Sequence, residues 1–325
     1  MEFRLELQPQ PLDKKMQLRD KIFLSGSCFT EHMSAKLSNH KFRILDNPHG
    51  ILFNPVSLAQ SINDCIIARQ YTVEELFEEQ GIWSSWSFHS RFSSADRNTA
   101  LTNMNNSVQE AHHFLQASRW LVLTLGSAFV YELSDHKIVA NCHKVPAVNF
   151  NKRLLSIEEV QATIEEMIYK LHIFNPELNI IFTISPVRHL RDGLIENNRS
   201  KAVLLHAVHH LVDKFDKMHY FPAYELVIDD LRDYRFFAED MVHPNYQATE
   251  YVWQKFAESC IAPESREVMR EIHKINAARV HKPLHPESDH HKSFLNKYFE
   301  QTYALAQKFP FLDFNDEISY FSNAI

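Results

Sequence analysis

The chain has 325 residues, with 34 Lys and Arg against 41 Asp and Glu, a formal net charge of −7 and 45% hydrophobic residues. These values are ordinary for a globular protein with a sizeable core, and they exclude extended disorder and the basic surface of a general nucleic-acid binder. Only 5 residues are glycine, where average usage would give roughly 23, so each glycine is expected where the backbone requires it.

Apolar and amphipathic segments alternate along most of the chain. Short apolar runs that end at a glycine or a proline, as at 120–126 and 179–185, are typical of buried strands. A capping box at 156–159 and prolines at 55 and 244 mark the starts of helices. In chain order we predict strands at 21–26, 42–45, 120–126, 179–185 and within 220–228, and helices at 30–37, 55–69, 73–80, 100–117, 156–174, 198–217 and 244–259.

This alternation predicts an α/β fold: a three-layer α/β/α sandwich with a mostly parallel central sheet, interrupted by a hairpin at 129–141. Sites in such sheets lie at the carboxyl ends of the strands. After residue 262 no strand pattern remains, and we expect two helices around a His- and Pro-rich loop at 281–286. The chain therefore divides into an α/β domain at 1–262 and a helical C-terminal appendage at 263–325.

The N-terminal residues, the most apolar window and the spacing of the cysteines predict where in the cell the protein is found. Residues 1–7 carry a charge at every second position, unlike a signal peptide, and the most apolar window, 120–133, is too short to span a bilayer. The four cysteines, at 28, 65, 142 and 260, form no C-x-x-C pair and are expected to be free thiols in a reducing compartment. We therefore expect a cytoplasmic protein without membrane insertion.

The first predicted strand ends at Gly26-Ser27-Cys28, directly before a helix. A side chain at such a turn is exposed at its tip, and it faces the positive end of the helix, which lowers a thiol pKa. Cys28 is therefore a candidate nucleophile. A buried, inert cysteine in a turn is the alternative.

A second motif, Asp240-x-x-His243-Pro244-Asn245, precedes the last helix of the α/β region. An Asp three residues before a His can accept a hydrogen bond from one ring nitrogen, while the other nitrogen faces a nucleophile. D-x-x-H alone occurs often by chance. Its place in a loop before the last helix makes Asp240 and His243 a candidate catalytic dyad.

Together, these motifs resemble the GSCFA family, which is similar in outline to the SGNH (GDSL-type) hydrolase superfamily. The resemblance covers roughly residues 20–260 and rests first on Gly26-Ser27-Cys28-Phe29. Further matching stretches are Leu52-Phe-Asn54-Pro55, Phe88-His-Ser-Arg-Phe92, Asn141-Cys-His-Lys-Val-Pro146, Ile184-Ser-Pro-Val187, Ser200-Lys-Ala202, Tyr220-Phe-Pro222 and His243-Pro-Asn245.

The resemblance implies roles for individual residues. Cys28 stands in place of the superfamily's nucleophilic serine, and Asp240 and His243 match its dyad. Gly50 falls where a glycine N–H serves the oxyanion. Ala128 stands where the superfamily has an asparagine, so the side-chain amide of the oxyanion hole is missing. Such a donor contributes on the order of 10²–10³ in kcat.

The implied function is hydrolysis of ester bonds, as an esterase or an acyl transferase, on a small-molecule or saccharide ester. The alternative is a catalytically degenerate protein of this fold that binds an acylated or carbohydrate ligand without turnover, which Ala128 favours. No cofactor, metal or nucleic acid is expected, and the oligomeric state is left open. Whether Cys28 or Ser27 is the nucleophile is also open.

Several polar residues are candidates for replacement oxyanion donors or for substrate contacts. They are Ser27, Asn54, His89, Asn141 and His143, the last two within the loop 141–144. Each has a structural alternative, because Asn before Pro often caps a helix and loop histidines often lie on the surface. The helical histidines 206, 209 and 210 share one face, but without a carboxylate at the right step we interpret them as surface residues.

Overall fold

The computed structural model describes residues 4–323. Its centre is a five-stranded parallel sheet in the order β10-β9-β5-β1-β2. The strands are β1 (Lys21–Gly26), β2 (Arg43–Asp46), β5 (Trp120–Leu125), β9 (Asn179–Ile184) and β10 (Met218–Tyr220). All six residues of β5 and of β9 are buried, as the apolar runs predicted. The predicted parallel sheet is thus confirmed.

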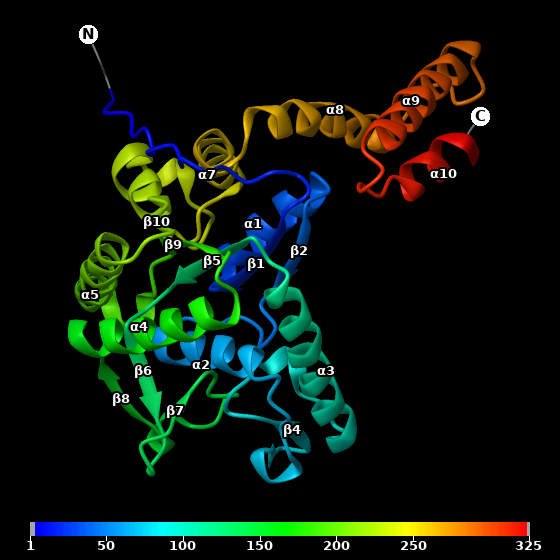
Figure 1. Cartoon of the computed structure of the whole chain (residues 1–325). Helices are drawn as coiled ribbons and strands as arrows, with labels where there is room; N and C mark the ends of the chain where they lie inside the picture. The colour runs from blue at the N-terminus through cyan, green and yellow to red at the C-terminus, as the bar shows by residue number, and fades with distance from the viewer. Residues whose placement is uncertain (1–3, 324–325) are drawn as a thin grey trace.

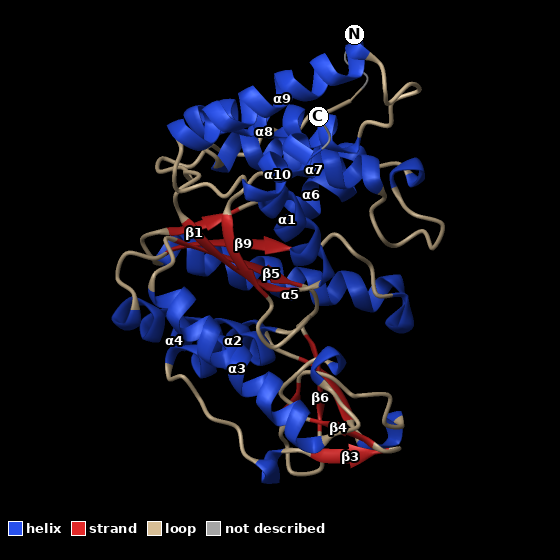
Figure 2. Ribbon diagram, turned by 90° about the vertical axis from the view of Figure 1, so that its right-hand side faces the viewer, coloured by secondary structure: helices blue, strands red, loops and turns tan. Residues whose placement is uncertain are grey.

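Helices cover both faces of this sheet, which gives the predicted three layers (Figure 2). Successive side chains of β1 serve opposite cores: Phe23 packs into one, and Ile22 and Leu24 into the other. The first face is covered by α2 (Pro55–Ile66), α3 (Arg97–Gln116), α4 (Ile157–Phe174) and α5 (Gly193–Lys214), and the second by α1 (Cys28–Asn39), α6 (Ala223–Glu225) and α7 (Tyr246–Cys260).

Two small sheets lie together at the end of the molecule opposite α9 (Figures 1 and 2). One is the hairpin of β3 (Phe77–Glu79) and β4 (Ile82–Ser84), and the other joins β6 (Phe129–Glu132), β7 (Ile138–Val139) and β8 (Asn151–Leu154). The β6–β7 hairpin was predicted.

The prediction of a helix at 73–80 is wrong. Only a 3₁₀ turn forms, at Val73–Glu75, and the chain then enters β3. Gln80 and Gly81 both have positive φ, 52° and 77°, as a two-residue hairpin turn requires. The stacking of Phe77 on Trp86, with ring centroids 3.8 Å apart, further stabilises the extended conformation.

The last strand lies earlier in the chain than the range 220–228 that was predicted to contain it. β10 ends at Tyr220, and the chain turns helical from Ala223 through a π-helix at Leu226–Leu231. α7 starts at Tyr246 with Asn245 as its cap, so Pro244 lies just before the helix instead of within its first turn.

Three helices follow the α/β region instead of the two predicted: α8 (Pro263–Val280), α9 (Asp289–Lys308) and α10 (Asn315–Asn323). They project from the body that holds the sheet (Figure 1). Met269 and Ile272 of α8 nevertheless pack into the core beneath α1 and α7. The division at residue 262 stays a prediction.

Within residues 4–323, no helix combines the length and the apolar character needed to cross a bilayer.

Candidate active site

The turn between β1 and α1 places Cys28 at the carboxyl edge of the sheet. Gly26 has φ +148°, and a Cβ there would lie 2.2 Å from the carbonyl oxygen of Thr124, so the neighbouring strand leaves room only for glycine. The side-chain oxygen of Asn47 accepts the Gly26 N–H at 2.8 Å. Cys28 is the first residue of α1 and is partly exposed, whereas Ser27 is 1% exposed. The thiol, not the neighbouring hydroxyl, is therefore accessible.

The environment of the thiol acts in both directions on its pKa. Burial raises the pKa of Cys28, and the carboxylate of Glu31 raises it further. The N–H groups of Phe29 and Cys28, and the charge of Lys201, lower it. Burial prevails, so the pKa of the thiol is raised. The start of the helix lowers the pKa as expected, but burial outweighs this contribution, so the resting thiol needs a base.

Asp240 and His243 form a hydrogen-bonded pair in the loop before α7. His243 Nδ1 lies 2.6 Å from Asp240 Oδ2, and Oδ1 accepts the N–H groups of Val242 and His243, each at 3.0 Å. Because of these three contacts, the pKa of Asp240 falls to about 2. The ionised carboxylate therefore holds Nδ1 as the donor, which leaves Nε2 as an acceptor.

The loop that carries the pair is closed by backbone hydrogen bonds. The N–H of Ala238 donates to the His243 carbonyl at 2.7 Å, and that of Asn245 donates to Phe236 at 2.9 Å. Met241 at the tip has φ 60°. The loop is thus a turn held by its own hydrogen bonds, and the side chain of His243 on it is 48% exposed.

Two histidines near the β1–α1 turn and after β9 have pKa values to which the charge of His243 contributes. His32 lies one turn along α1 from Cys28; burial lowers its pKa, and the charge of His243 lowers it further. His189, which follows β9, has a pKa lowered by burial and by the charges of Lys201 and His243. Among residues 4–323, no hydrogen bond joins Cys28 to His243. The two halves of the site are thus not hydrogen-bonded to each other in the described part of the chain.

The expected oxyanion donor at Gly50 is already engaged. Its N–H donates to the carbonyl of Asn47 at 2.7 Å, within a turn in which Gly50 has φ +82°. The N–H of Ala128 donates to Ser200 Oγ at 2.7 Å. Cys28 and Phe29, at the start of α1, have N–H groups without a backbone acceptor among residues 4–323. The start of the helix is therefore the available donor.

Asn54 is a helix cap. Its Oδ1 accepts the N–H of Ser57 at 2.8 Å, and its Nδ2 donates to Ser57 Oγ at 3.0 Å. Both ends of the amide are thus occupied, and the structural alternative for this residue holds.

His89, Asn141 and His143 belong to two loops that contact each other. Asn141 accepts the N–H of His143 at 2.7 Å, and His143 Nε2 lies 2.9 Å from the Ser85 carbonyl. A Cβ added at Gly50 would lie 2.3 Å from the Cβ of His89, so His89 packs against the turn after β2. Its neighbour Arg91 reaches Glu31 on α1 at 3.3 Å. The loop that carries His89 is therefore connected to α1 by one ion pair.

The family profile of GSCFA, described as the GSCFA family, matches residues 21–256, and a second profile, described as the GSCFA domain protein C-terminal domain, matches residues 272–325. The chain belongs to the GSCFA family. No match is found among curated proteins.

Solved structures share the general arrangement at low similarity. A Streptococcus pneumonia protein described as a platelet activating factor has a TM-score of 0.39 and 12% identity, over 74% of this chain and 82% of its own. A carbohydrate esterase family 3 protein from Talaromyces cellulolyticus has a TM-score of 0.36 and 7% identity, over 78% of this chain and 99% of its own. The Clostridium thermocellum family 3 carbohydrate esterase has a TM-score of 0.36 and 8% identity, over 77% of this chain and 97% of its own. A likeness this distant says nothing about the reaction.

This GSCFA protein has a cavity of about 260 Å³ lined by residues that follow β5 and β9 and by the loop after β7. Aromatic rings and polar groups line it together, and it includes both Asn54 and Asn141 from the predicted site. Its lining residues are Phe53, Asn54, Ser127, Phe129, Tyr131, Val139, Ala140, Asn141, Cys142, His189, Arg191 and Asp192. His189 links the cavity to the dyad electrostatically, because the charge of His243 contributes to lowering the pKa of His189.

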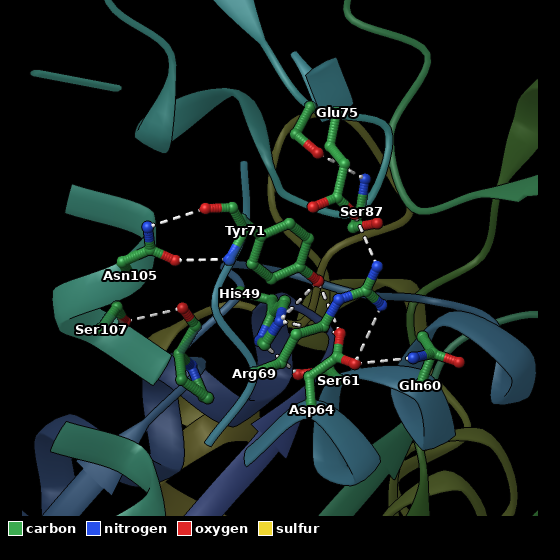
Figure 3. Close-up of polar contacts among 12 residues, drawn as sticks. His49, Gln60, Ser61, Asp64, Arg69, Tyr71, Glu75, Ser87, Asn105 and Ser107 are labelled. Atoms are coloured by element: carbon green, nitrogen blue, oxygen red, sulfur yellow. Dashed lines mark hydrogen bonds and ion pairs between the residues drawn. The ribbon is translucent and has the colours of Figure 1, made fainter. Parts of the chain in front are cut away.

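A buried polar network lies behind the Gly50 turn (Figure 3). His49 is 1% exposed, with Nδ1 2.7 Å from Ser61 Oγ and Nε2 3.6 Å from Asp64 Oδ2. Tyr71 donates to the same carboxylate oxygen at 2.5 Å, and Arg69 reaches Oδ1 at 3.2 Å. Although it contains a serine, a histidine and an aspartate, the network is enclosed by side chains, so it anchors the turn.

One GSCFA residue near the site was not predicted to be functional. Lys201 lies in the Ser200-Lys-Ala202 stretch of the family resemblance, and it is 1% exposed. Its charge acts on both Cys28 and His189. The helical pattern around it is that of an ordinary amphipathic helix, so the only sequence signal was the family stretch itself.

Proposed function

We propose that this GSCFA protein cleaves ester bonds by acyl transfer through Cys28, with His243 as the base and Asp240 as the residue that orients it. The observation that carries the proposal is the 2.6 Å contact of His243 Nδ1 with a carboxylate that two backbone N–H groups also hold. This arrangement leaves Nε2 to accept a proton at the sheet edge where Cys28 begins α1.

In the proposed reaction, the Cys28 thiol gives its proton to His243 Nε2 and the sulfur attacks the ester carbonyl carbon. The C–O bond then breaks, and His243 returns the proton to the leaving alkoxide, which departs as an alcohol. A water, or the hydroxyl of an acceptor, attacks the resulting thioester with His243 again as base, which restores the thiol. The N–H groups of Cys28 and Phe29, which have no backbone acceptor among residues 4–323, are the proposed donors to the developing oxyanion.

Substrate binding is proposed for the cavity beside His189. Its aromatic rings offer stacking surfaces, and Asn141, Arg191 and Asp192 offer hydrogen bonds. This combination suits a small-molecule or saccharide ester.

A second candidate function is binding without turnover. Two observations favour it: Ala128 brings no side-chain amide, and the N–H of Gly50 donates to Asn47. Both oxyanion donors that the superfamily pattern implies are then lost, and each contributes on the order of 10²–10³ in kcat.

A panel of p-nitrophenyl esters of increasing acyl length separates the two. Wild type is compared with Cys28→Ala and with Ser27→Ala, a matched removal of the neighbouring buried hydroxyl. Catalysis by the thiol predicts that Cys28→Ala loses at least about a thousandfold in kcat/KM, while Ser27→Ala keeps most activity. Equal activity in wild type and Cys28→Ala contradicts the proposed nucleophile. No activity in wild type on any ester or thioester favours the binding protein.

A further inference from the structure

The loop that carries Asp240 and His243 forms part of an apolar groove. The groove has a volume of about 260 Å³, and Met241, which stands in the sequence between the two members of the dyad, lines it. Most of the lining is apolar and comes from α5, from the π-helix at Leu226–Leu231 and from the segment before the dyad. The apolar lining residues are Leu194, Val227, Ile228, Tyr234, Phe237 and Met241.

Three of these apolar side chains are largely exposed to solvent. Leu194 and Met241 are each 54% exposed, and Tyr234 is 72% exposed. Met241 has φ 60°, which is uncommon for a residue other than glycine, and its N–H donates to the Ala238 carbonyl at 2.9 Å. The turn thus keeps an apolar side chain at the groove. Exposed apolar side chains that gather in one hollow are typical of a site that binds an apolar group.

The polar lining of this groove carries an excess of positive charge. Arg188 and Arg232 line it, and among residues 4–323 neither takes part in an ion pair. The one carboxylate of the lining, that of Asp233, is ion-paired with Arg235 at 3.3 Å. An apolar surface with unpaired guanidinium groups matches a ligand that joins an apolar chain to an anionic end. The fatty acid anion released when an ester is hydrolysed has this chemistry.

The groove and the cavity beside His189 border the same segment of chain. Arg188 lines the groove, whereas the next residue, His189, lines the cavity proposed for substrate binding. The two differ in character, since the cavity mixes aromatic rings with polar groups and the groove is mostly apolar. An ester also has two parts, an acyl group and an alcohol, which extend in different directions from the bond that is cleaved.

We propose that the groove at Met241 is the acyl subsite, and that it binds the unbranched apolar acyl chain of an ester and the fatty acid anion derived from it. Its volume exceeds the roughly 150 Å³ in which an apolar cavity holds benzene, so a chain of several carbons has room. The acyl part rests on the proposed function, because the dyad would cleave the ester at the end of this chain. Binding of the fatty acid anion does not require turnover.

The first measurement therefore uses binding alone. Protein labelled with ¹³C at the methionine methyl groups is titrated with octanoate and, for comparison, with acetate, and the Met241 signal is assigned by its loss in Met241→Leu. We expect octanoate to shift this signal to saturation and to bind at least roughly tenfold more tightly than acetate, because its chain buries more apolar surface. A Met241 signal that does not respond to octanoate, or that responds equally to acetate, overturns the proposal.

Two neighbouring residues of α5 provide a matched pair of variants. Leu194 lines the groove, whereas Ile195 is 77% exposed and does not line it. Leu194→Ser is expected to weaken octanoate binding roughly fivefold or more, and Ile195→Ser to leave it unchanged. An equal effect of the two changes would assign this surface to contact with a membrane or another protein, and would overturn the groove as a subsite.

The second measurement follows cleavage of p-nitrophenyl esters from acetate to octanoate. In wild type, kcat/KM is expected to rise by up to roughly fourfold for each added methylene until the groove is filled. Leu194→Ser should flatten this dependence, and Ile195→Ser should keep it. Ester cleavage without any preference for longer chains overturns the acyl subsite alone. Octanoate binding at Met241 without cleavage of any ester contradicts the proposed function alone, and leaves the groove as a site for fatty acid anions.

Discussion

His243 Nδ1 lies 2.6 Å from Asp240 Oδ2, while Asp240 Oδ1 accepts the N–H groups of Val242 and His243. The carboxylate is thus held by its own loop before it meets the imidazole. Because this environment brings the pKa of Asp240 to about 2, the carboxylate stays ionised throughout the pH range in which a histidine titrates. The tautomer of His243 is set by this contact.

Replacing either member of this pair is expected to reduce ester cleavage with little effect on folding. His243→Ala removes the base, and we expect a loss of about a thousandfold or more in kcat/KM. Asp240→Asn favours the wrong tautomer, with an expected loss of about 10²–10⁴ in kcat. Both side chains are 48% exposed, so thermal midpoints should stay near that of wild type. A large fall in midpoint without any change in turnover would assign the pair a structural role.

The four cysteines are expected to differ strongly in reactivity. Cys65 and Cys260 are completely or almost completely buried, and burial raises the pKa of Cys260 to about 12 and that of Cys65 further. Cys28 and Cys142 are partly exposed. At Cys28 the N–H groups at the start of α1 and the charge of Lys201 favour the thiolate, whereas at Cys142 only the charge of Arg191 does so. Iodoacetamide at neutral pH should therefore label Cys28 first, as peptide mass spectrometry can show. Faster labelling of Cys142 would place the reactive thiol in the cavity loop instead.

The glycine at position 50 is expected to be indispensable for the turn after β2. Gly50 has φ +82°, and a Cβ there would lie 2.3 Å from His89 Cβ, so Gly50→Ala adds both backbone strain and a clash. Gly81 has a similar φ, +77°, with nothing within 4 Å of an added Cβ. Gly81→Ala thus measures the strain alone, about 1–2 kcal/mol. Denaturant unfolding should show a clearly larger loss for Gly50→Ala. Equal losses would mean that the His89 loop moves aside freely.

How far the sequence predicts this molecule depends on how local each cause is. The runs at 120–126 and 179–185 are apolar throughout, and a strand buried on both faces requires that composition, so β5 and β9 were predicted. The segment 73–80 has helical composition, but the turn at Gln80 and Gly81 and the stacking of Phe77 on Trp86 favour a hairpin. Tertiary packing prevails there over local preference.

The site shows the same division. Cys28, Asp240 and His243 were predicted because each lies in a short motif whose chemistry is local. Lys201 was not, because its burial arises from the ends of two strands that pack against α5 from elsewhere in the chain. The raised pKa of Cys28 has the same origin: the start of the helix is visible in the sequence, whereas burial is not.

Removal of residues 263–325 is expected to leave a core that still unfolds cooperatively but with lower stability. The α/β sheet and its helices lie before residue 262, yet Met269 and Ile272 of α8 cover part of the second core, and Ser265 Oγ accepts the N–H of Leu18 at 3.2 Å. Truncation after Ala262 exposes this apolar face, so lower solubility is also expected. Circular dichroism and thermal unfolding of the truncated chain check this. A chain without a cooperative transition would show that α8 completes the core.

The buried network behind the Gly50 turn is expected to make folding sensitive to mild acid. Burial lowers the pKa of His49 below that of an exposed histidine, although Asp64 opposes the shift. Below about pH 6.5 the unfolded chain therefore takes up a proton at this position that the native protein does not. The free energy of unfolding should fall as the pH drops from 6.5 through the lowered pKa, and this contribution is fully present above pH 6.5.

His49→Gln tests this contribution by comparison with wild type. The variant should be less stable at pH 7, because it loses the contacts with Ser61 and Asp64, but it should lose less unfolding free energy than wild type between pH 7 and pH 5. His32, His40 and His189 also have pKa values lowered by burial, so the difference between the two proteins, not the slope of either, is the measurement. His290→Gln, an exposed change at the start of α9, is the control and should keep the wild-type slope. Parallel curves for wild type and His49→Gln would mean that His49 takes up its proton inside the folded protein, and that the network opens before the chain unfolds.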